Sequence, residues 1–305
     1  MSSTLKSANW FHPDGFPIAI EWRDPQENFP PHNHDFSEIV IVTGGKGLHV
    51  TGRESWTLSA GDVFVIGGAR RHAYRDLDRL KLVNVLFRPE LLRLRIADLA
   101  RLPGYHALFT LEPAWRRRHR FESRLRLTPS DLGPVLALVE HLDLELRRRE
   151  PGFGFMATAL FMQLAGLLSR HYGRSPNADS RSLLRIAQAI SHLETHFAEP
   201  LSLATLAAMA QMSKRSFLRT FRASMGLTPI AYLIQLRVHH AAARLRSTRE
   251  SVTDIAFGCG FSDSNYFTRQ FGRIMGQAPR RYRQQHRLPE TPMEHPIAAR
   301  LRLGA

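Results

Sequence analysis

The sequence of 305 residues lacks the features that mark exported or membrane-spanning proteins. Its single cysteine, Cys259, excludes an intramolecular disulfide and fits a reducing cytosol. The opening stretch, MSSTLKSANW, has no apolar segment of the kind that signals export. No stretch approaches the ~18 uninterrupted apolar residues of a membrane span. We therefore expect a soluble, cytoplasmic protein with no membrane partner.

Common catalytic motifs are also absent. The sequence has no G-x-S-x-G, no P-loop and no H-E-x-x-H. Cys259 lies in a segment that we interpret as the turn between two helices, where a small buried thiol serves as a packing residue. We expect no enzymatic activity, apart from one alternative that the histidines of the N-terminal half leave open.

Acidic residues are scarce relative to basic ones. The chain has 27 Asp and Glu against 42 Lys and Arg, a formal net charge of +15 and a pI near 11.0. Residues 181–286 hold 15 basic and 5 acidic residues, a net +10, whereas residues 1–172 hold 23 and 19, a net +4. A polyanion such as double-stranded DNA is therefore expected to bind the C-terminal third.

Short apolar segments at regular spacing predict a β-rich N-terminal region. Glycine-containing turns such as TGGKG and SAGD separate them, which is typical of an antiparallel sandwich or barrel. The predicted strands are residues 18–22, 38–42, 47–50, 56–58, 62–66 and 80–87.

Two helical segments follow, residues 131–149 and 155–172, and the break EPGFG predicts that they fold back as an antiparallel pair. The first has an apolar stripe of Leu136, Val139, Leu142 and Leu146. This stripe could pack inside its own domain or against a second copy, and we expect the second arrangement, a homodimer.

The segment GRSPNADS, residues 173–180, has the composition of a linker. We therefore predict an N-terminal domain of residues 1–172, an all-α domain of residues 181–286 and a disordered tail of residues 287–305. In the all-α domain, Ser202, Ser213 and Ser251 are predicted helix N-caps, and a long helix is predicted to begin at Thr228–Pro229.

An internal repeat organises the second domain. Phe217 and Phe221 correspond to Phe267 and Phe271 at an offset of 50 residues. Each unit, at about 203–226 and 252–276, reads as a short helix, a turn and a longer helix: a helix-turn-helix. A single pattern of this kind is common in all-α proteins, and a basic face is usually just solvated. Two in tandem in the most basic region predict DNA binding, with the long helix setting their spacing.

The stretch SVTDIAFGCGFSDSNYFTRQFGRIMGQAPRRYR closely resembles the C-terminal signature of AraC/XylS-type bacterial transcription regulators, and LATLAAMAQMSKRSFLRTFRASMGLTPIAYL resembles their first helix-turn-helix. FPPHNHDFSEIVIVTGGKGLHV and RHAYRDLDRLKLVNVLFRP resemble the sensor domain of regulators of L-rhamnose catabolism. The resemblance leaves residues 90–130 and the tail poorly matched. It implies a cupin-type β-barrel that binds a small effector, a helical pair for dimerisation, and RNA polymerase as a partner.

Motif position in this family assigns candidate DNA contacts. Arginine reads guanine, asparagine suits adenine, and aspartate accepts from cytosine, whereas arginines farther along a recognition helix suit phosphates. The base-contacting candidates are Arg215, Arg219, Asp263 and Asn265. The phosphate-contacting candidates are Arg222, Arg269 and Arg273.

The N-terminal domain contains H-x-H-x3-E, formed by His32, His34 and Glu38, and His72 follows at the spacing of the second cupin motif. In metal-binding cupins such a set holds one ion. The second motif departs from the pattern, with Gly67 in place of a usual Pro and Asp76 in place of a usual Asn. We therefore expect no metal and no cofactor, and assign His32, His34, Glu38 and His72 to an effector pocket whose polar groups suit a polyol.

The prediction is thus a DNA-binding transcriptional activator that responds to a small sugar, with L-rhamnose as the first candidate. One alternative is a metal-binding cupin enzyme, such as a dioxygenase or isomerase, fused to a DNA-binding module. Another is a regulator of the same family that answers to a different sugar or to an aromatic acid.

Overall fold

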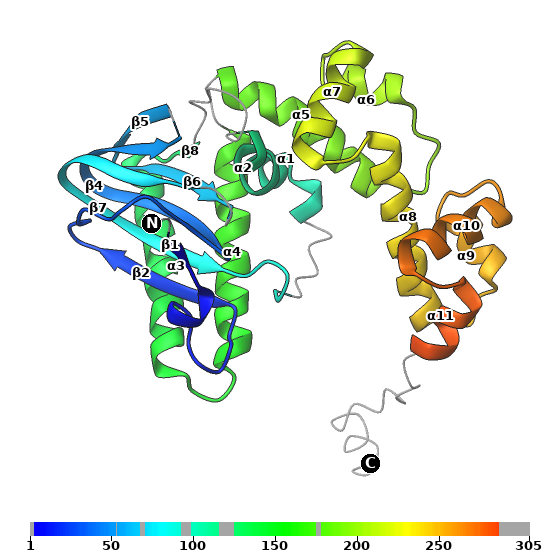
Figure 1. The fold of residues 1–305 in the computed structure, drawn as a ribbon, viewed down its shortest axis with the longest axis horizontal. Coiled ribbons are helices and arrows are strands. Elements are labelled where there is room, and N and C mark those ends of the chain that lie inside the picture. Colours follow the sequence, from blue (N-terminus) through cyan, green and yellow to red (C-terminus); the bar gives the residue numbers. More distant parts are fainter. Residues whose placement is uncertain are drawn as a thin grey trace, which may run out of the picture. The chain divides into compact units, whose positions relative to one another are not determined.

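A computed structural model describes residues 3–52, 54–67, 71–92, 99–115, 125–174 and 178–286. Its contacts divide the chain into two compact units, Met1–His196 with Leu201–Pro229, and Phe197–Pro200 with Ile230–Ala305. Seven of the eight described strands precede the helices α1 to α11 along the chain, close to the predicted order (Figure 1). The tail of residues 287–305 lies outside the described residues.

An antiparallel sheet forms the centre of the first unit. Its strand order is β2-β7-β4-β6-β8, and β5 pairs with β4. The strands are β2 (Ile18–Arg23), β4 (Ser37–Thr51), β5 (Glu54–Ser59), β6 (Asp62–Ile66), β7 (Ala73–Phe87) and β8 (Leu125–Arg126). Two further strands, β1 (Ser3–Leu5) and β3 (His32–His34), pair in parallel. A short helix, η1 (Ser7–Asn9), lies between β1 and β2.

The predicted strands are confirmed, but a closed barrel is not found among the described strands. The terminal strands β2 and β8 pair only with β7 and β6, respectively, so the described sheet has open ends. Two predicted strands are in fact one, because β4 continues through TGGKG with register shifts between Val42 and Leu48. Gly45 permits this path: its φ is +66°, and a Cβ there would lie 2.0 Å from the carbonyl oxygen of Arg79.

The helical pair is confirmed as α3 (Pro129–Arg148) and α4 (Phe153–Gly173), which pack against each other. The apolar stripe of α3 was predicted to pack against a second copy of the chain. This prediction is wrong for Val139 and Leu142, because both are fully buried within the protomer. Helix α3 also packs on β2, and the ring of Phe161 on α4 lies 5.2 Å from that of Phe87 on β7. Both helices of the pair thus pack on the sheet.

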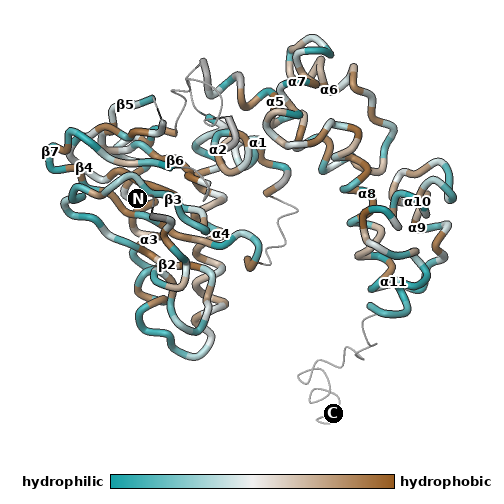
Figure 2. Tube along the Cα trace, in the orientation of Figure 1, coloured by the Kyte–Doolittle hydropathy of each residue, from teal (hydrophilic) through white to brown (hydrophobic). Residues whose placement is uncertain are grey.

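Helix α4 is long and apolar enough by length and composition to cross a membrane (Figure 2). A third of its most apolar window is buried (33%), and the buried side chains include Phe161, Leu164 and Tyr172. Phe155 and Met156 at its start, in contrast, are 77% and 47% exposed.

Between β7 and α3 the sequence shows no clear periodicity. Among the described residues of this stretch, four short helices precede β8: η2 (Leu99–Arg101), α1 (Pro103–Tyr105), the π-helix η3 (His106–Leu111) and α2 (Glu112–Trp115). Helix α5 (Ala178–Thr195) packs on η2, α1 and η3. Because of these contacts α5 groups with the N-terminal elements, although the expected domain boundary was residues 173–180. Residues 175–177 of that linker lie outside the described residues, and the domain limits stay a prediction.

Helices α6 (Leu203–Met209) and α7 (Lys214–Met225) complete the first unit, and the side chains of Ser202 and Ser213 cap them as predicted. The second unit contains α8 (Pro229–Ser247), α9 (Val252–Gly258), α10 (Ser264–Met275) and α11 (Pro279–His286). The first residue of α8, Pro229, is counted with the first unit. Ser251 caps α9, and Cys259 is buried in the core with Phe267 and Phe271. Its role as a packing residue is confirmed.

Candidate effector pocket and DNA-binding faces

A small, partly open pocket lies within the first unit. Three of the four predicted effector residues line it: His32, Glu38 and His72. The backbones of His32 and His72 exchange two hydrogen bonds of 3.0 and 2.8 Å, which hold both residues at one edge of the pocket. His34 does not line the pocket. It is 2% exposed and stacks on the ring of Phe36 at 4.5 Å.

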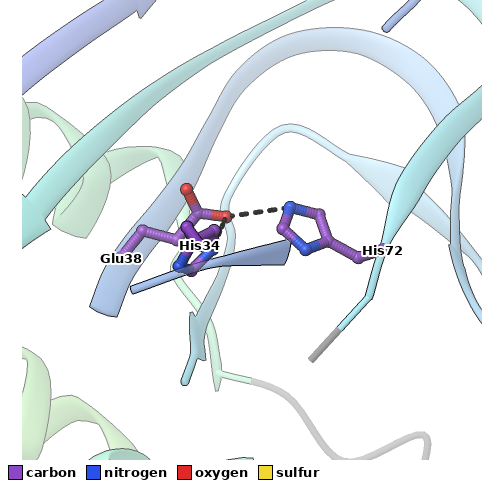
Figure 3. A group of neighbouring side chains, drawn as sticks. All are labelled: His34, Glu38 and His72. Atoms are coloured by element: carbon purple, nitrogen blue, oxygen red, sulfur yellow. Dashed lines mark ion pairs between the residues drawn. The ribbon is translucent and has the colours of Figure 1, made fainter. Parts of the chain in front are cut away.

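Glu38 is the centre of this polar group. Its Oε1 lies 3.2 Å from Nε2 of His72 and 3.7 Å from Nε2 of His34 (Figure 3). Burial raises the pKa of Glu38, but the two histidines lower it more, and the net pKa lies well below the usual range. The carboxylate is therefore ionised in the folded protein.

The two histidines of β3 differ in charge preference. Burial, followed by the charge of His72, lowers the pKa of His32 to about 4, so its ring is neutral at pH 7. Burial also lowers the pKa of His34, but Glu38 and the carbonyl of Phe36 outweigh it, and the net pKa is raised above 6.5. Nδ1 of His34 lies 2.5 Å from the carbonyl oxygen of Phe36 and donates a hydrogen bond to it. Nε2 is therefore the ring nitrogen that faces Glu38. We interpret His34 as the residue that orients Glu38.

Three of these side chains also form a set that could hold a metal ion. His34, Glu38 and His72 each offer one ligand atom, and these atoms lie within 4.8 Å of one another. Two imidazoles and a carboxylate suit a divalent transition metal. The ring centroids of His32 and His72 are 4.3 Å apart, but His32 is not one of the three. Of the four residues in the cupin motifs, three therefore bring their donor atoms together. In this structure both histidines of the three pair with the carboxylate of Glu38.

Several pocket residues were missed by the sequence reasoning. Tyr74 and Asn84 on β7 contribute polar groups, and Trp10 and Phe29 contribute aromatic rings. Asn84 carried a usable signal, since it interrupts the apolar run LKLVNVLF and a polar side chain inside a buried strand requires a partner. The two aromatic residues lie in irregular segments, where no periodicity reveals them.

The three arginines predicted on α7 are exposed: Arg215, Arg219 and Arg222. Phe217 and Phe221, in contrast, are fully buried. At 100° per residue, phenylalanines four residues apart share one face, so Arg219 between them points to the opposite face. The helix therefore presents a basic outer face.

Helix α10 repeats this arrangement in the second unit. Phe267 and Phe271 are buried, whereas Asn265, Arg269 and Arg273 are exposed. The guanidinium of Arg269 lies 5.9 Å from the ring centroid of Tyr266.

Asp263 has a local role that the sequence reasoning did not assign. It is the N-cap of α10, and its Oδ1 accepts a hydrogen bond from the backbone N–H of Tyr266. The side chain is exposed. Because one oxygen serves the cap, only Oδ2 remains for the proposed base contact.

A polar pocket in an antiparallel-sheet domain, followed by helices α7 and α10 with basic outer faces, is the arrangement of a DNA-binding regulator with a sensor domain. The chain matches the AraC-like ligand binding domain family over residues 17–143 and a helix-turn-helix domain family over residues 206–285. It belongs to the AraC family of helix-turn-helix transcriptional regulators.

The chain is similar over most of its length to curated relatives. It is 38% identical over 285 residues to the HTH-type transcriptional activator RhaS of Enterobacter sp. (strain 638), with 92% of this chain and 97% of the relative covered. The HTH-type transcriptional activator RhaR of Mannheimia succiniciproducens is 31% identical over 279 residues, with 92% and 96% covered. Among solved structures, the DNA-binding domain of AdpA in complex with a target DNA is 35% identical, covering 33% of this chain and 91% of that chain with a TM-score of 0.32.

Proposed function

We propose that this chain activates genes of sugar catabolism in response to a small sugar, with L-rhamnose the first candidate. The observation that carries the proposal is the polar pocket around Glu38. The chain that contains it aligns with transcriptional activators over nearly their whole length. These relatives do not favour the alternative of a metal-dependent cupin enzyme. The resemblance of the N-terminal sequence to regulators of L-rhamnose catabolism supports the choice of effector.

The charge of the pocket supports a neutral effector over an aromatic acid. Glu38 is buried and ionised, so the carboxylate of an acid would meet a like charge at short range. Sugar hydroxyls, in contrast, donate hydrogen bonds to a carboxylate at little cost. His32, being neutral, provides a further polar contact.

For DNA binding, Arg215, Arg219, Asp263 and Asn265 are proposed to read bases, and Arg222, Arg269 and Arg273 to bind phosphates. The exposure of all seven side chains supports this assignment. The net charge of +10 on residues 181–286 supports binding to a polyanion. Two tandem helix-turn-helix units, α6–α7 and α9–α10, are proposed to enter successive major-groove segments.

We also propose a homodimer, formed through a different surface of the helical pair. Leu144 on α3 and Phe155 and Met156 on α4 are 43%, 77% and 47% exposed. A twofold axis would bury such residues of both copies together. Because the relatives are activators, the dimer is proposed to act with RNA polymerase at promoters in the cytoplasm.

Binding of the purified chain to DNA upstream of its own gene and of neighbouring genes tests this function. We expect affinity or occupancy to change with L-rhamnose, or with another neutral sugar in a small panel, and not with aromatic acids. DNA binding that no sugar alters, combined with a response to an aromatic acid, would overturn the sugar assignment. No DNA binding at all would overturn the role as a regulator.

A further inference from the structure

Two buried polar atoms in the effector pocket have no hydrogen-bond partner among the described residues: the hydroxyl of Tyr74 and Oδ1 of Asn84. Tyr74 is 6% exposed, so bulk water does not readily reach its hydroxyl. The carboxylate of Glu38, which His34 and His72 hold through Oε1, lines the same pocket. An unsatisfied buried polar atom is costly, and native proteins retain such atoms where a ligand or ordered water completes them.

The sheet register places Glu38 and Asn84 on the same face of the sheet. Glu38 on β4 is paired with Leu86 on β7, and Asn84 lies two residues from Leu86 on the same face. Glu38 and Asn84 are therefore diagonal neighbours, which lie about 7–8 Å apart in antiparallel sheets. Tyr74 is at the other end of β7, and the charge of Glu38, after burial, raises its pKa, so the two groups lie within electrostatic range.

Aromatic groups of the pocket complement this polar side. The rings of Trp10 and Phe29 contribute apolar surface, together with Leu86. Sites for small molecules commonly combine apolar walls with a few convergent polar groups that fix the ligand's orientation. A monosaccharide has this dual character, because its hydroxyls lie at the ring edge and its C–H groups form apolar patches.

We propose that Tyr74 and Asn84 are effector-specificity residues that act with Glu38: together they bind three hydroxyls of a neutral monosaccharide whose apolar face lies against Trp10 and Phe29. Glu38 and Asn84 accept hydrogen bonds from two hydroxyls, and Tyr74 donates to a third. This inference rests on the proposed sugar response, and it assigns the discrimination between sugars to two residues outside the H-x-H-x3-E motif.

Tyr74→Phe and Asn84→Leu in the full chain test the assignment, with L-rhamnose, L-fucose, L-arabinose and D-xylose as probes in calorimetric titrations. Tyr74→Phe removes the hydroxyl, and Asn84→Leu removes the amide oxygen and nitrogen, without a large change in side-chain volume. We expect affinity for the best sugar to fall roughly 10- to 100-fold. The thermal midpoint without sugar stays unchanged or rises, because an unsatisfied polar atom has been removed. Tyr105→Phe, in α1 and outside the pocket, is the matched control and leaves affinity unchanged.

Deoxy analogues of the best sugar provide a second readout that does not depend on the folding of the variants. We expect wild-type protein to bind at least one singly deoxygenated analogue roughly 10- to 100-fold more weakly, and Tyr74→Phe to show no further loss with one of them. Variants that bind sugar like wild type, or wild-type protein that binds every deoxy analogue equally well, overturn the assignment of Tyr74 and Asn84. Wild-type protein that binds none of the sugars overturns the proposed sugar response itself.

Discussion

Oε1 of Glu38 on β4 lies 3.2 Å from Nε2 of His72, the residue that precedes β7. The two side chains are 4% and 2% exposed. This buried ion pair joins β4 to the residue before β7 at the wall of the candidate pocket, and His34 adds a second imidazole to the same oxygen at 3.7 Å. The stability of the sensor should therefore depend on pH in a way that identifies individual histidines.

We expect the thermal midpoint of the protein to fall on both sides of about pH 6.5. The folded state raises the pKa of His34 above 6.5, so the stability it contributes is present below 6.5 and is lost as pH rises through the raised value. The folded state lowers the pKa of His32 to about 4. Stability is therefore lost as pH falls from 6.5 towards 4, because unfolded His32 binds a proton that folded His32 does not.

The two limbs of this pH profile should respond to separate substitutions. His32→Gln should flatten the acidic limb, and His34→Gln should flatten the alkaline limb, as measured by thermal unfolding between pH 4 and pH 9. A profile that neither substitution changes would show that other groups control the pH dependence.

We expect Arg219 on the outer face of α7 to contact DNA bases. We expect Arg273, near the C-terminal end of α10, to contact the phosphate backbone of the DNA. Arg219→Ala is expected to cost about 1–3 kcal/mol of binding and to relax the preference at one base pair. Arg273→Ala should weaken all sequences alike and reduce the salt slope of binding by about one. Selection of binding sites from random DNA checks both results. If Arg273→Ala changes the preferred base and Arg219→Ala does not, the two roles are reversed.

Asp263 allows its capping role to be separated from base contact. Asp263→Asn keeps an N-cap acceptor but removes the charge, so we expect unchanged folding stability and altered preference at a C·G pair. Asp263→Ala should also lose about 0.5–2 kcal/mol of stability. If Asp263→Asn leaves base preference unchanged, the residue serves only as the cap of α10.

Dimerisation should depend on the start of α4. Phe155→Asp places a charge on the proposed interface, where desolvation without a partner is costly, and should shift the protein towards monomer in sedimentation. Leu91→Asp is a matched control at a residue that is 49% exposed and lies outside the helical pair. A monomeric wild type, or equal effects of both substitutions, would contradict the interface.

Metal removal distinguishes the two uses of the polar set around Glu38. We expect purified protein to contain no stoichiometric transition metal and to keep its sugar affinity after dialysis against EDTA. Elemental analysis and calorimetry check this prediction. One equivalent of metal whose removal abolishes sugar binding would instead establish His34, Glu38 and His72 as metal ligands.

The sequence predicted regular elements better than the pocket. The positions of the strands, Ser213 as an N-cap and the Phe217–Phe221 spacing depend on local rules, and the structure confirms all three. The stripe on α3 was harder to interpret, because an apolar face does not reveal whether its partner is the same chain or another. Tyr74 and Asn84 meet Glu38 only through the pairing of β4 with β7, a register that local sequence patterns do not specify.

Transcription from the natural promoter in a purified system tests the central claim most directly. The assay contains RNA polymerase, this protein and promoter DNA, with and without L-rhamnose, and Glu38→Ala as the comparison. The account predicts that L-rhamnose increases the transcript with wild-type protein, and that Glu38→Ala binds DNA but gives no increase. A transcript level that is the same with and without sugar for wild-type protein, across the panel of neutral sugars, would contradict it.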